Sequence, residues 1–306
     1  MSAHGRSEAL IPERAARRES PVTPRQHRAI LTGASGGIGA AIAAAIAPHC
    51  AALLLVGRDT ARLEEVRDAV ARPGLYCRVI ACDLTTADGR EAIANAAADV
   101  PHGPNLLINN AGTGEFAWFA DQNDESIARI LGINTLAPML LTRRMLPLLQ
   151  QQRAATVVNV GSIFGYLGYP GCAAYSASKF ALRGFTEALR RELADGPVRV
   201  VYFAPRATRT ALNGAAVNAL NERLGTAMDP PERVAEALMR LLKRPVRERL
   251  LGMPERLFAK VNQILPALVD NGLRKQLDVI RSHARRGVPR PALPATSIRS
   301  SEGAKP

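Results

Sequence analysis

The sequence predicts an α/β fold: a doubly wound parallel sheet with helices on both faces, followed by a C-terminal amphipathic helical extension. Short, uninterrupted apolar runs alternate with longer segments of helical spacing, and such runs indicate parallel strands buried on both faces. Glycines are concentrated in the turn between the first predicted strand and the first predicted helix, which is typical of doubly wound sheets. The 306 residues, 47% of them hydrophobic, suffice for one large domain or two small ones.

The predicted strands and helices follow one another in regular alternation. Arg28–Leu31 is the first strand, and after the glycine turn an Ala- and Ile-rich helix continues to about Ala47. The remaining strands and helices are assigned by the same two patterns. The strands are expected at Ala52–Val56, Leu75–Ala81, Leu106–Asn109, Ala155–Val160 and Val198–Phe203, and the helices at Thr60–Ala71, Asp88–Ala98, Asp124–Gln151 and Ala173–Leu193.

Beyond about residue 250 the alternation ends. Glu255 to about Arg281 can be written as one amphipathic helix, which Pro266 should kink. The predicted organisation is a basic disordered arm (1–27), the folded domain (28–254), the helical extension (255–286) and a disordered tail (287–306). In the extension, the apolar residues expected to face inward are Leu257, Phe258, Val261, Ile264, Leu265, Leu268, Leu273, Leu277 and Ile280.

The formal net charge of +13 lies mainly at the ends of the chain. Residues 1–28 contain six Arg and three Glu, and residues 281–306 contain five Arg, one Lys and one Glu, so the central part is only mildly basic. Aromatic residues make up 4% of the chain, too few for a platform that stacks single-stranded nucleic acid. No motif that reads nucleic acid is present, so no specific nucleic-acid partner is expected.

Cysteine usage and the N-terminal segment bear on the compartment. The four cysteines form no CxxC pair and no Cys/His spacing typical of a metal site, so no metal is expected. Residues 1–27 lack the apolar core of a secretory signal, and a transit peptide is the less favoured alternative to a disordered arm. We therefore expect a reduced, cytoplasmic chain with no membrane-spanning helix.

The turn after the first strand has the composition of a phosphate-binding turn. It reads Thr32-Gly33-Ala34-Ser35-Gly36-Gly37-Ile38-Gly39. Glycines at 33, 37 and 39 let the backbone turn tightly and approach a phosphate, and the following helix N-terminus supplies N–H groups and a positive dipole. A nucleotide site is predicted here; a tight strand–helix turn without a ligand is the alternative.

A tyrosine, a lysine and a serine form a candidate acid/base site. Tyr175 and Lys179 are four residues apart in a predicted helix, so they share one face. A lysine ammonium there is expected to lower the pKa of the tyrosine towards neutrality, as a general acid or base requires. Ser162 follows the fifth strand, at the edge where such sheets bind ligands, and its hydroxyl can hold a substrate carbonyl oxygen. For the Tyr/Lys pair alone, a solvated helix face is the alternative.

Four motifs, in this order and at these spacings, resemble the short-chain dehydrogenase/reductase (SDR) superfamily. They are TGASGGIG at 32–39, Asn109-Asn110-Ala111-Gly112, Ser162, and Tyr175-Ser176-Ala177-Ser178-Lys179. The resemblance spans roughly residues 28–250 and implies a single Rossmann-type catalytic domain, an NAD(P)-dependent oxidoreductase. It adds Asn134 to the catalytic set Ser162, Tyr175 and Lys179, where it would anchor a water in a proton relay; capping or packing would explain an asparagine there equally well.

The resemblance also implies a set of cofactor-binding residues. Asp83 and Leu84 would contact the adenine, although an ordinary Asp at a strand end is the alternative for Asp83. The NNAG segment would line the cofactor and support the central strand. The full implied set is Gly33, Ser35, Gly37, Ile38, Gly39, Arg58, Asp83, Leu84, Asn110, Ala111, Gly112, Tyr175, Lys179, Pro205, Thr208 and Thr210.

The end of the second strand, Gly57-Arg58-Asp59, bears on the choice of cofactor. NAD-binding sheets usually place an acid at this strand end for the ribose 2′-hydroxyl, whereas an arginine accommodates the 2′-phosphate of NADP. Position 57 is Gly and Arg58 follows, an arrangement that resembles NADP(H) enzymes. Asp59 lies past the usual acid position and is expected to cap the next helix instead. NADP(H) is therefore the predicted cofactor.

One departure from the family pattern follows the sixth strand. The family usually shows Pro-Gly and then a Thr that holds the nicotinamide carboxamide, and here the run is Pro205-Arg206-Ala207-Thr208-Arg209-Thr210. Thr210 has the usual spacing, with Thr208 as a rival. Arg206 in place of Gly adds a charge near the cofactor or the pocket mouth, unless it is simply solvated.

The predicted function is an NADP(H)-dependent interconversion of a ketone or aldehyde with an alcohol, with Tyr175 as acid/base. Phe164, Tyr166, Leu167, Tyr169 and Pro170 border the site, which favours an apolar acyl, polyketide or steroid-like substrate; core packing of the same residues is equally compatible. The alternative function is a non-catalytic NADP(H)-binding sensor or scaffold on the same fold.

The sequence is compatible with several kinds of macromolecular partner. A homodimer or tetramer is expected from the resemblance. The basic C-terminal helix could pack on the domain, form a partner interface, or contact a membrane surface peripherally. The basic tails could also steer an acidic carrier protein.

Overall fold

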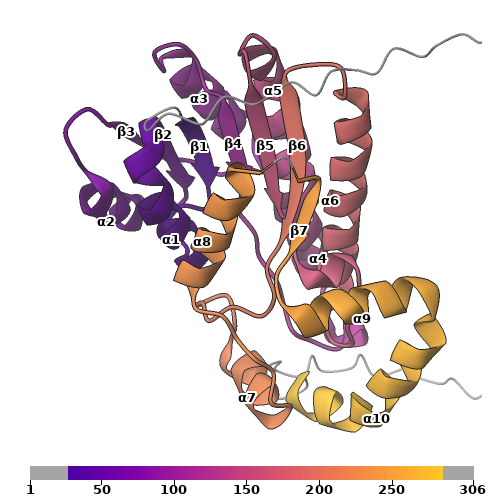
Figure 1. Cartoon of the computed structure of the whole chain (residues 1–306). Coiled ribbons are helices and arrows are strands. Elements are labelled where there is room, and N and C mark those ends of the chain that lie inside the picture. The colour runs from indigo at the N-terminus through magenta and orange to yellow at the C-terminus, as the bar shows by residue number, and fades with distance from the viewer. Residues whose placement is uncertain (1–26, 245, 285–306) are drawn as a thin grey trace, which may run out of the picture.

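The computed structural model describes residues 27–244 and 246–284, and in this part the chain forms a seven-stranded parallel sheet (Figure 1). The strand order β3-β2-β1-β4-β5-β6-β7 reverses between β1 and β4. In open sheets of this kind, that reversal creates the crevice in which ligands bind. The strands are β1 (His27–Thr32), β2 (Cys50–Gly57), β3 (Tyr76–Ala81), β4 (Leu106–Asn109), β5 (Ala155–Val160), β6 (Val198–Ala204) and β7 (Glu248–Leu250).

Helices cover both faces of the sheet, which confirms the predicted fold class. One face carries α1 (Gly37–Ile46), α2 (Thr60–Val70) and α8 (Pro231–Leu242). The other carries α3 (Ala87–Ala98), α5 (Ala137–Gln150) and α6 (Ala173–Glu192). The remaining described helices are α4 (Asp124–Leu131), α7 (Ala215–Arg223), α9 (Met253–Ile264) and α10 (Pro266–Ala284).

Strand β2 shows why the apolar runs are uninterrupted. Leu53 and Leu55 pack into the core on the α1/α8 face, whereas Leu54 and Val56 pack into the core on the α3/α5 face. All four side chains are fully buried. A strand that is covered on both sides needs apolar residues at every position, so the sequence shows a run rather than an alternation.

The prediction of one continuous helix over Asp124–Gln151 is wrong. The structure divides it into α4, a five-residue π-helical segment η3 (Gly132–Leu136), and α5. Such π-bulges shift the helical register and are frequent at functional sites. The six predicted strands are all present, whereas β7, α7 and α8 were not predicted individually.

The C-terminal extension is two helices rather than one kinked helix. Helix α9 ends at Ile264 and α10 starts at Pro266, because proline lacks the N–H that would continue the helix. The inward orientation predicted for the apolar residues is wrong for five of them: Leu257, Phe258, Ile264, Leu265 and Leu268 are exposed. Ile280 is buried as predicted.

Three further expectations can be compared with the described residues. The predicted disordered arm and tail fall almost entirely in 1–26 and 285–306, outside the described residues. All four cysteines are free thiols. Among residues 27–244 and 246–284, no helix is both long and apolar enough to cross a bilayer.

Candidate active site

The structure brings the four predicted catalytic residues together at the carboxyl edge of the sheet. Ser162 follows β5, and Tyr175 and Lys179 lie one turn apart on α6. The Tyr175 hydroxyl hydrogen-bonds the Ser162 side chain, and Lys179 Nζ lies 5.7 Å from the centre of the Tyr175 ring. A methyl group on Gly112 would lie 3.4 Å from Asn134 Oδ1 and 3.7 Å from Lys179 Nζ, so both side chains border one space.

Asn134 is held rigidly inside the π-helical segment. Its side chain accepts a 2.8 Å hydrogen bond from the backbone N–H of Thr113 and donates one of 2.8 Å to the Thr113 carbonyl. Its amide also donates to Ser178 Oγ at 3.0 Å. These bonds satisfy a buried amide, so packing explains much of its presence in a helix. They also fix its carbonyl oxygen next to Gly112.

Lys179 is a buried ammonium with one backbone partner. Its Nζ donates a 3.1 Å hydrogen bond to the Val160 carbonyl. Burial lowers the pKa of Lys179 from 10.5 to about 8, because desolvation disfavours the charged form. The fold therefore holds a charge where apolar packing alone would disfavour it, which is typical of a functional site.

The predicted lowering of the Tyr175 pKa is wrong for this structure. Burial raises the pKa of Tyr175 to about 12, and the hydrogen bond from Ser162 only partly opposes this effect. Sequence spacing identifies the neighbour of the tyrosine but not its degree of burial. Near neutral pH Tyr175 is therefore a phenol, which is the form that donates a proton.

Tyr202 is a positioning residue that sequence reasoning missed. It is fully buried at the end of β6, and its hydroxyl accepts a 3.2 Å hydrogen bond from the Ser162 N–H. The same hydroxyl lies 3.3 Å from the backbone carbonyls of Ser162 and Lys179. A side chain on Gly161 would collide with the Tyr202 ring, and one on Gly165 would collide with the Tyr202 hydroxyl. A buried tyrosine in an apolar strand needs a hydrogen-bond partner. This requirement is the feature of the sequence that points to Tyr202.

Tyr202→Phe is expected to lower kcat more than it raises KM, because the ring keeps its packing while the hydroxyl that holds the Ser162 backbone is lost. The free energy of unfolding should fall by about 1 kcal/mol. Steady-state kinetics and urea unfolding measure the two effects. Tyr166→Phe is the matched control, since it also removes a buried hydroxyl, which bonds Glu248 instead (2.7 Å). Equal kcat values for the two variants would contradict the positioning role.

The glycine turn leaves a helix N-terminus free for an anion. Gly33 has a φ of +65°, and a Cβ there would lie 2.7 Å from Ala111 Cα, so only glycine fits. A Cβ on Gly39 would collide with the Gly33 carbonyl. No side chain caps the first turn of α1. The uncapped N–H groups and close backbone therefore fit the pyrophosphate of a dinucleotide.

Asn110 supports that turn rather than facing solvent. Its side-chain amide donates 3.1 Å hydrogen bonds to the carbonyls of Thr32 and Gly33. The Thr32 hydroxyl accepts from the backbone N–H groups of Asn110 and Ala111, both at 3.0 Å. The NNAG segment thus ties β4 to the glycine turn, which agrees with its predicted structural role.

Strand β2 ends at Gly57 and is followed by Arg58 and Asp59. Asp59 is the N-cap of α2 and accepts a 3.1 Å hydrogen bond from the Arg62 N–H, as predicted. A Cβ on Gly57 would lie 3.2 Å from Ser35 Oγ, so Ser35 reaches from the glycine turn to this strand end. Arg58 is exposed and close enough to Asp83 to help lower the pKa of that carboxyl.

Asp83 is engaged locally, which favours the strand-end interpretation of its side chain. Its carboxylate accepts from the Thr85 N–H at 2.8 Å and the Thr85 hydroxyl at 2.7 Å, and these bonds lower its pKa. Leu84 is buried against the core on the α3/α5 face.

Of the two candidate threonines after β6, Thr210 lies at the glycine turn. A Cβ on Gly37 would lie 3.2 Å from Thr210 Cγ2. The Thr208 hydroxyl instead donates a 2.9 Å hydrogen bond to the Arg206 carbonyl and is buried. Pro205 adjoins the catalytic set, since its carbonyl accepts from the Ile163 N–H at 3.3 Å.

Arg206, the departure from the family pattern, is neither solvated nor a free charge in the pocket. Its guanidinium binds both carboxylate oxygens of Asp229, at 2.8 and 2.7 Å, and reaches Glu255 of α9 at 3.5 Å. The pair is largely buried, and the guanidinium holds the pKa of Asp229 below its usual value. Arg206 therefore ties the loop after β6 to the segment before α8 and to the C-terminal extension.

The aromatic residues predicted to border the site divide into two groups. Phe164 stacks on Tyr169 with ring centres 5.0 Å apart, and its ring meets Tyr175 edge-on at 6.2 Å. Tyr166 turns into the core instead, under the Arg183 guanidinium. Gly114 was missed by sequence reasoning, although a Cβ there would lie 3.1 Å from the Tyr175 ring.

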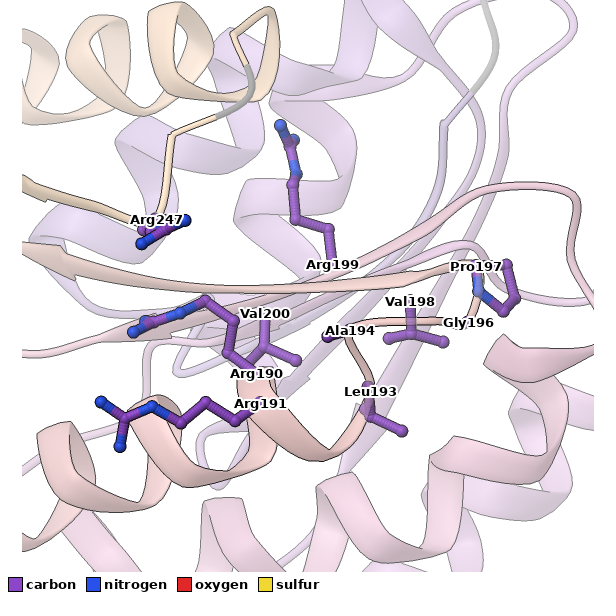
Figure 2. A pocket seen from close by; sticks show the side chains of 10 residues that line it. All are labelled: Arg190, Arg191, Leu193, Ala194, Gly196, Pro197, Val198, Arg199, Val200 and Arg247. Carbon is purple, nitrogen blue, oxygen red and sulfur yellow. The ribbon is translucent and has the colours of Figure 1, made fainter. Parts of the chain in front are cut away.

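A cavity of about 440 Å³ lies elsewhere, at the amino end of β6 (Figure 2). Four of its lining residues are arginines, but structural roles account for three of them. Arg190 and Arg191 lie in the last turn of α6, where the helix dipole stabilises positive charge. Arg199 donates to the carbonyls of Leu242 and Arg244 at the end of α8. Because Ser162 and Tyr175 lie at the opposite edge of the sheet, this cavity is separate from the catalytic set.

The sequence profile of the short chain dehydrogenase family matches residues 27–221. The chain belongs to this family. A curated relative, the ketoacyl reductase HetN of Nostoc sp., is 30% identical over 248 residues, which cover 79% of this chain and 86% of the relative. This short chain dehydrogenase is therefore an oxidoreductase that uses a nicotinamide dinucleotide.

Solved structures of short-chain dehydrogenases share the fold. One from Burkholderia phymatum, in complex with NAD, has a TM-score of 0.73 at 24% identity and covers 80% of this chain and 95% of its own. One from Sphingobium yanoikuyae, in complex with NADPH, has a TM-score of 0.66 at 26% identity and covers 80% and 96%. Both forms of the cofactor thus occur among the neighbours.

Proposed function

We propose that this short chain dehydrogenase is an NADPH-dependent carbonyl reductase. The observation that carries the proposal is the joint placement of Ser162, Tyr175, Lys179 and Asn134 beside an uncapped glycine turn. A non-catalytic sensor would need the turn but not a buried ammonium next to a half-buried phenol. The arrangement therefore favours chemistry over sensing.

Each side chain of the site has a separate role in the reaction. The bound nicotinamide dinucleotide supplies the hydride for the carbonyl carbon. The Ser162 hydroxyl holds the substrate oxygen, and the Tyr175 phenol donates its proton to that oxygen as it becomes an alkoxide. The Lys179 ammonium stabilises the phenolate that remains, and Asn134 borders the path by which the proton is replaced.

Near neutral pH, Tyr175 is protonated and Lys179 is charged. Because the pKa of Tyr175 is raised to about 12, the tyrosine is the proton donor and not the base at pH 7. Because the pKa of Lys179 is about 8, its ammonium is lost as the pH rises beyond that value. Alcohol oxidation needs the phenolate, so its rate is expected to rise as the pH increases above 7.

The preference for NADPH rests on the end of β2. Asp59 is committed to capping α2, so no carboxylate at this strand end is free to accept from a ribose 2′-hydroxyl. Arg58 and Ser35 supply a guanidinium and a hydroxyl that suit a 2′-phosphate instead.

Arg58→Ala is expected to raise the KM for NADPH by at least about tenfold, since charge-assisted bonds to a phosphate contribute about 1.5–3 kcal/mol. The KM for NADH should change little. Initial rates with both cofactors measure the effect, and Arg67→Ala, in the last turn of α2, is the control. A wild type that prefers NADH would contradict the NADPH assignment.

The substrate proposal is a carbonyl compound with an apolar body. The Phe164–Tyr169 stack beside Tyr175 supports it, as does the ketoacyl reductase activity named for the Nostoc relative. NADPH oxidation across a panel of 3-oxoacyl thioesters, cyclic ketones and aldehydes tests it. Turnover restricted to small polar carbonyls would contradict an apolar pocket.

A further inference from the structure

Helix α9 carries its apolar residues on the side that faces away from the protein. At 100° per residue, Met253, Leu257 and Ile264 fall within about 40° of one another. Ala259, which is buried, and Asn262 lie on the far side of the helix. A surface helix normally shows the opposite arrangement, with apolar residues towards the core.

The contacts of α9 fix this orientation. Asn262 donates a 2.9 Å hydrogen bond to the Tyr166 carbonyl, and Ala259 packs in the core beside Ile163 and Tyr166. Glu255, on the same side, meets Arg206. The helix is therefore held by its polar and small residues, and the outward apolar stripe is not free to turn inward.

The exposed apolar residues are concentrated in one segment of the chain. Met253, Leu257 and Ile264 are 74%, 64% and 75% exposed. Six of the twelve large apolar side chains that are exposed in the described residues fall between 253 and 268. The other three of these six are Phe258, Leu265 and Leu268. Figure 1 shows α9 and α10 together at one end of the molecule, away from β3 and α2.

Basic residues accompany this apolar surface. Arg256 and Lys260 lie beside the outward stripe of α9, and both are exposed. Arg274 and Lys275 are exposed on α10. The acidic Glu255 is engaged by Arg206, while Asp270 and Asp278 remain as exposed acids. An apolar stripe with a basic border is the pattern of a helix that lies in the surface of an anionic bilayer.

We propose that the outward face of α9 and the start of α10 docks on an anionic lipid surface. The positive charge of this surface favours an anionic lipid over a second copy of the chain. A second copy of the chain would bring like charges together across a two-fold interface, and the terminal segments 1–26 and 285–306 are themselves net positive. Because no described helix can cross a bilayer, the contact is peripheral. The proposal does not depend on the redox reaction.

Flotation with vesicles tests the apolar stripe. The full chain is expected to float with phosphatidylcholine vesicles that contain one part in about three of phosphatidylserine, and floating should decrease with salt. Leu257→Ser/Ile264→Ser should lower the bound fraction about tenfold or more, because binding scales with the apolar area inserted. Tyr76→Ser/Leu131→Ser removes two exposed apolar side chains elsewhere and should bind like the wild type.

A charge-reversal pair tests the basic border. Arg256→Glu/Lys260→Glu should lower the phosphatidylserine dependence markedly, whereas the matched pair Arg240→Glu/Lys243→Glu at the C-terminal end of α8 should preserve it. Absence of wild-type flotation would overturn the proposal. The proposal would also be overturned if Leu257→Ser/Ile264→Ser dissociated an oligomer in sedimentation velocity but bound vesicles as well as the Tyr76/Leu131 control. The outward face would then be a contact between copies of the chain.

Discussion

Tyr175→Phe is expected to lower kcat/KM for carbonyl reduction by about 10²–10⁴-fold, the usual contribution of a positioned general acid. The ring keeps its contacts with Gly114 and Phe164, so the fold and the cofactor site should be unchanged. Only the proton donor is removed. Initial rates with NADPH and a turned-over ketone measure the loss.

Cofactor binding distinguishes this loss from a general failure of the site. The Kd for NADPH, from fluorescence titration, should be the same in wild type and Tyr175→Phe. Tyr169→Phe is the matched control, because Tyr169 also lies in the aromatic group but has no proposed proton to donate. Full activity in Tyr175→Phe would refute the acid role, and absence of turnover in both proteins with normal NADPH binding would favour the sensor alternative.

Lys179→Met is expected to abolish activity and yet stabilise the fold near neutral pH. A pKa lowered from 10.5 to about 8 means that burial of the charged form costs about 3 kcal/mol. Loss of the bond to the Val160 carbonyl costs about 1 kcal/mol. The net gain in unfolding free energy should be about 2 kcal/mol at pH 7. Urea unfolding of both proteins measures it.

The pH dependence of that difference has a definite sign. Between about pH 8 and 10.5 the unfolded wild type keeps the Lys179 proton that the folded protein has lost. The wild type therefore gains stability as the pH rises through this window, while the methionine variant does not. Other buried groups, including Cys50 and Cys172, titrate here with the opposite sign, so the comparison is made between the two proteins. A difference that is constant with pH would contradict the buried ammonium.

Local patterns in the sequence were sufficient for the sheet and for the placement of Tyr175 and Lys179 on one face of a helix. A strand such as β2 is apolar at every position because both of its faces are covered, and this is visible as an uninterrupted run. The spacing of Tyr175 and Lys179 follows from helical periodicity in the same way. Asp59 could be assigned to a cap because the next helix starts directly after it.

Other features depend on tertiary contacts that spacing does not encode. The π-helical segment around Asn134 leaves no trace in the hydrophobic period, so one long helix was predicted. Amphipathicity identified the C-terminal helices but not which side is covered, and Leu257 and Ile264 were placed on the wrong side. The pKa of Tyr175 was predicted in the wrong direction because burial outweighs its neighbours.

We propose that a hydride passes to a carbonyl carbon at the site formed by Ser162, Tyr175 and Lys179. Reduction of a substrate ketone with NADPH deuterated at the transferring position of the nicotinamide, followed by mass spectrometry of the alcohol, tests it most directly. We expect one deuterium on the carbinol carbon in the wild type, and a rate of label transfer in Tyr175→Phe reduced in proportion to its kcat. An alcohol without deuterium, or undiminished label transfer by Tyr175→Phe, would contradict it.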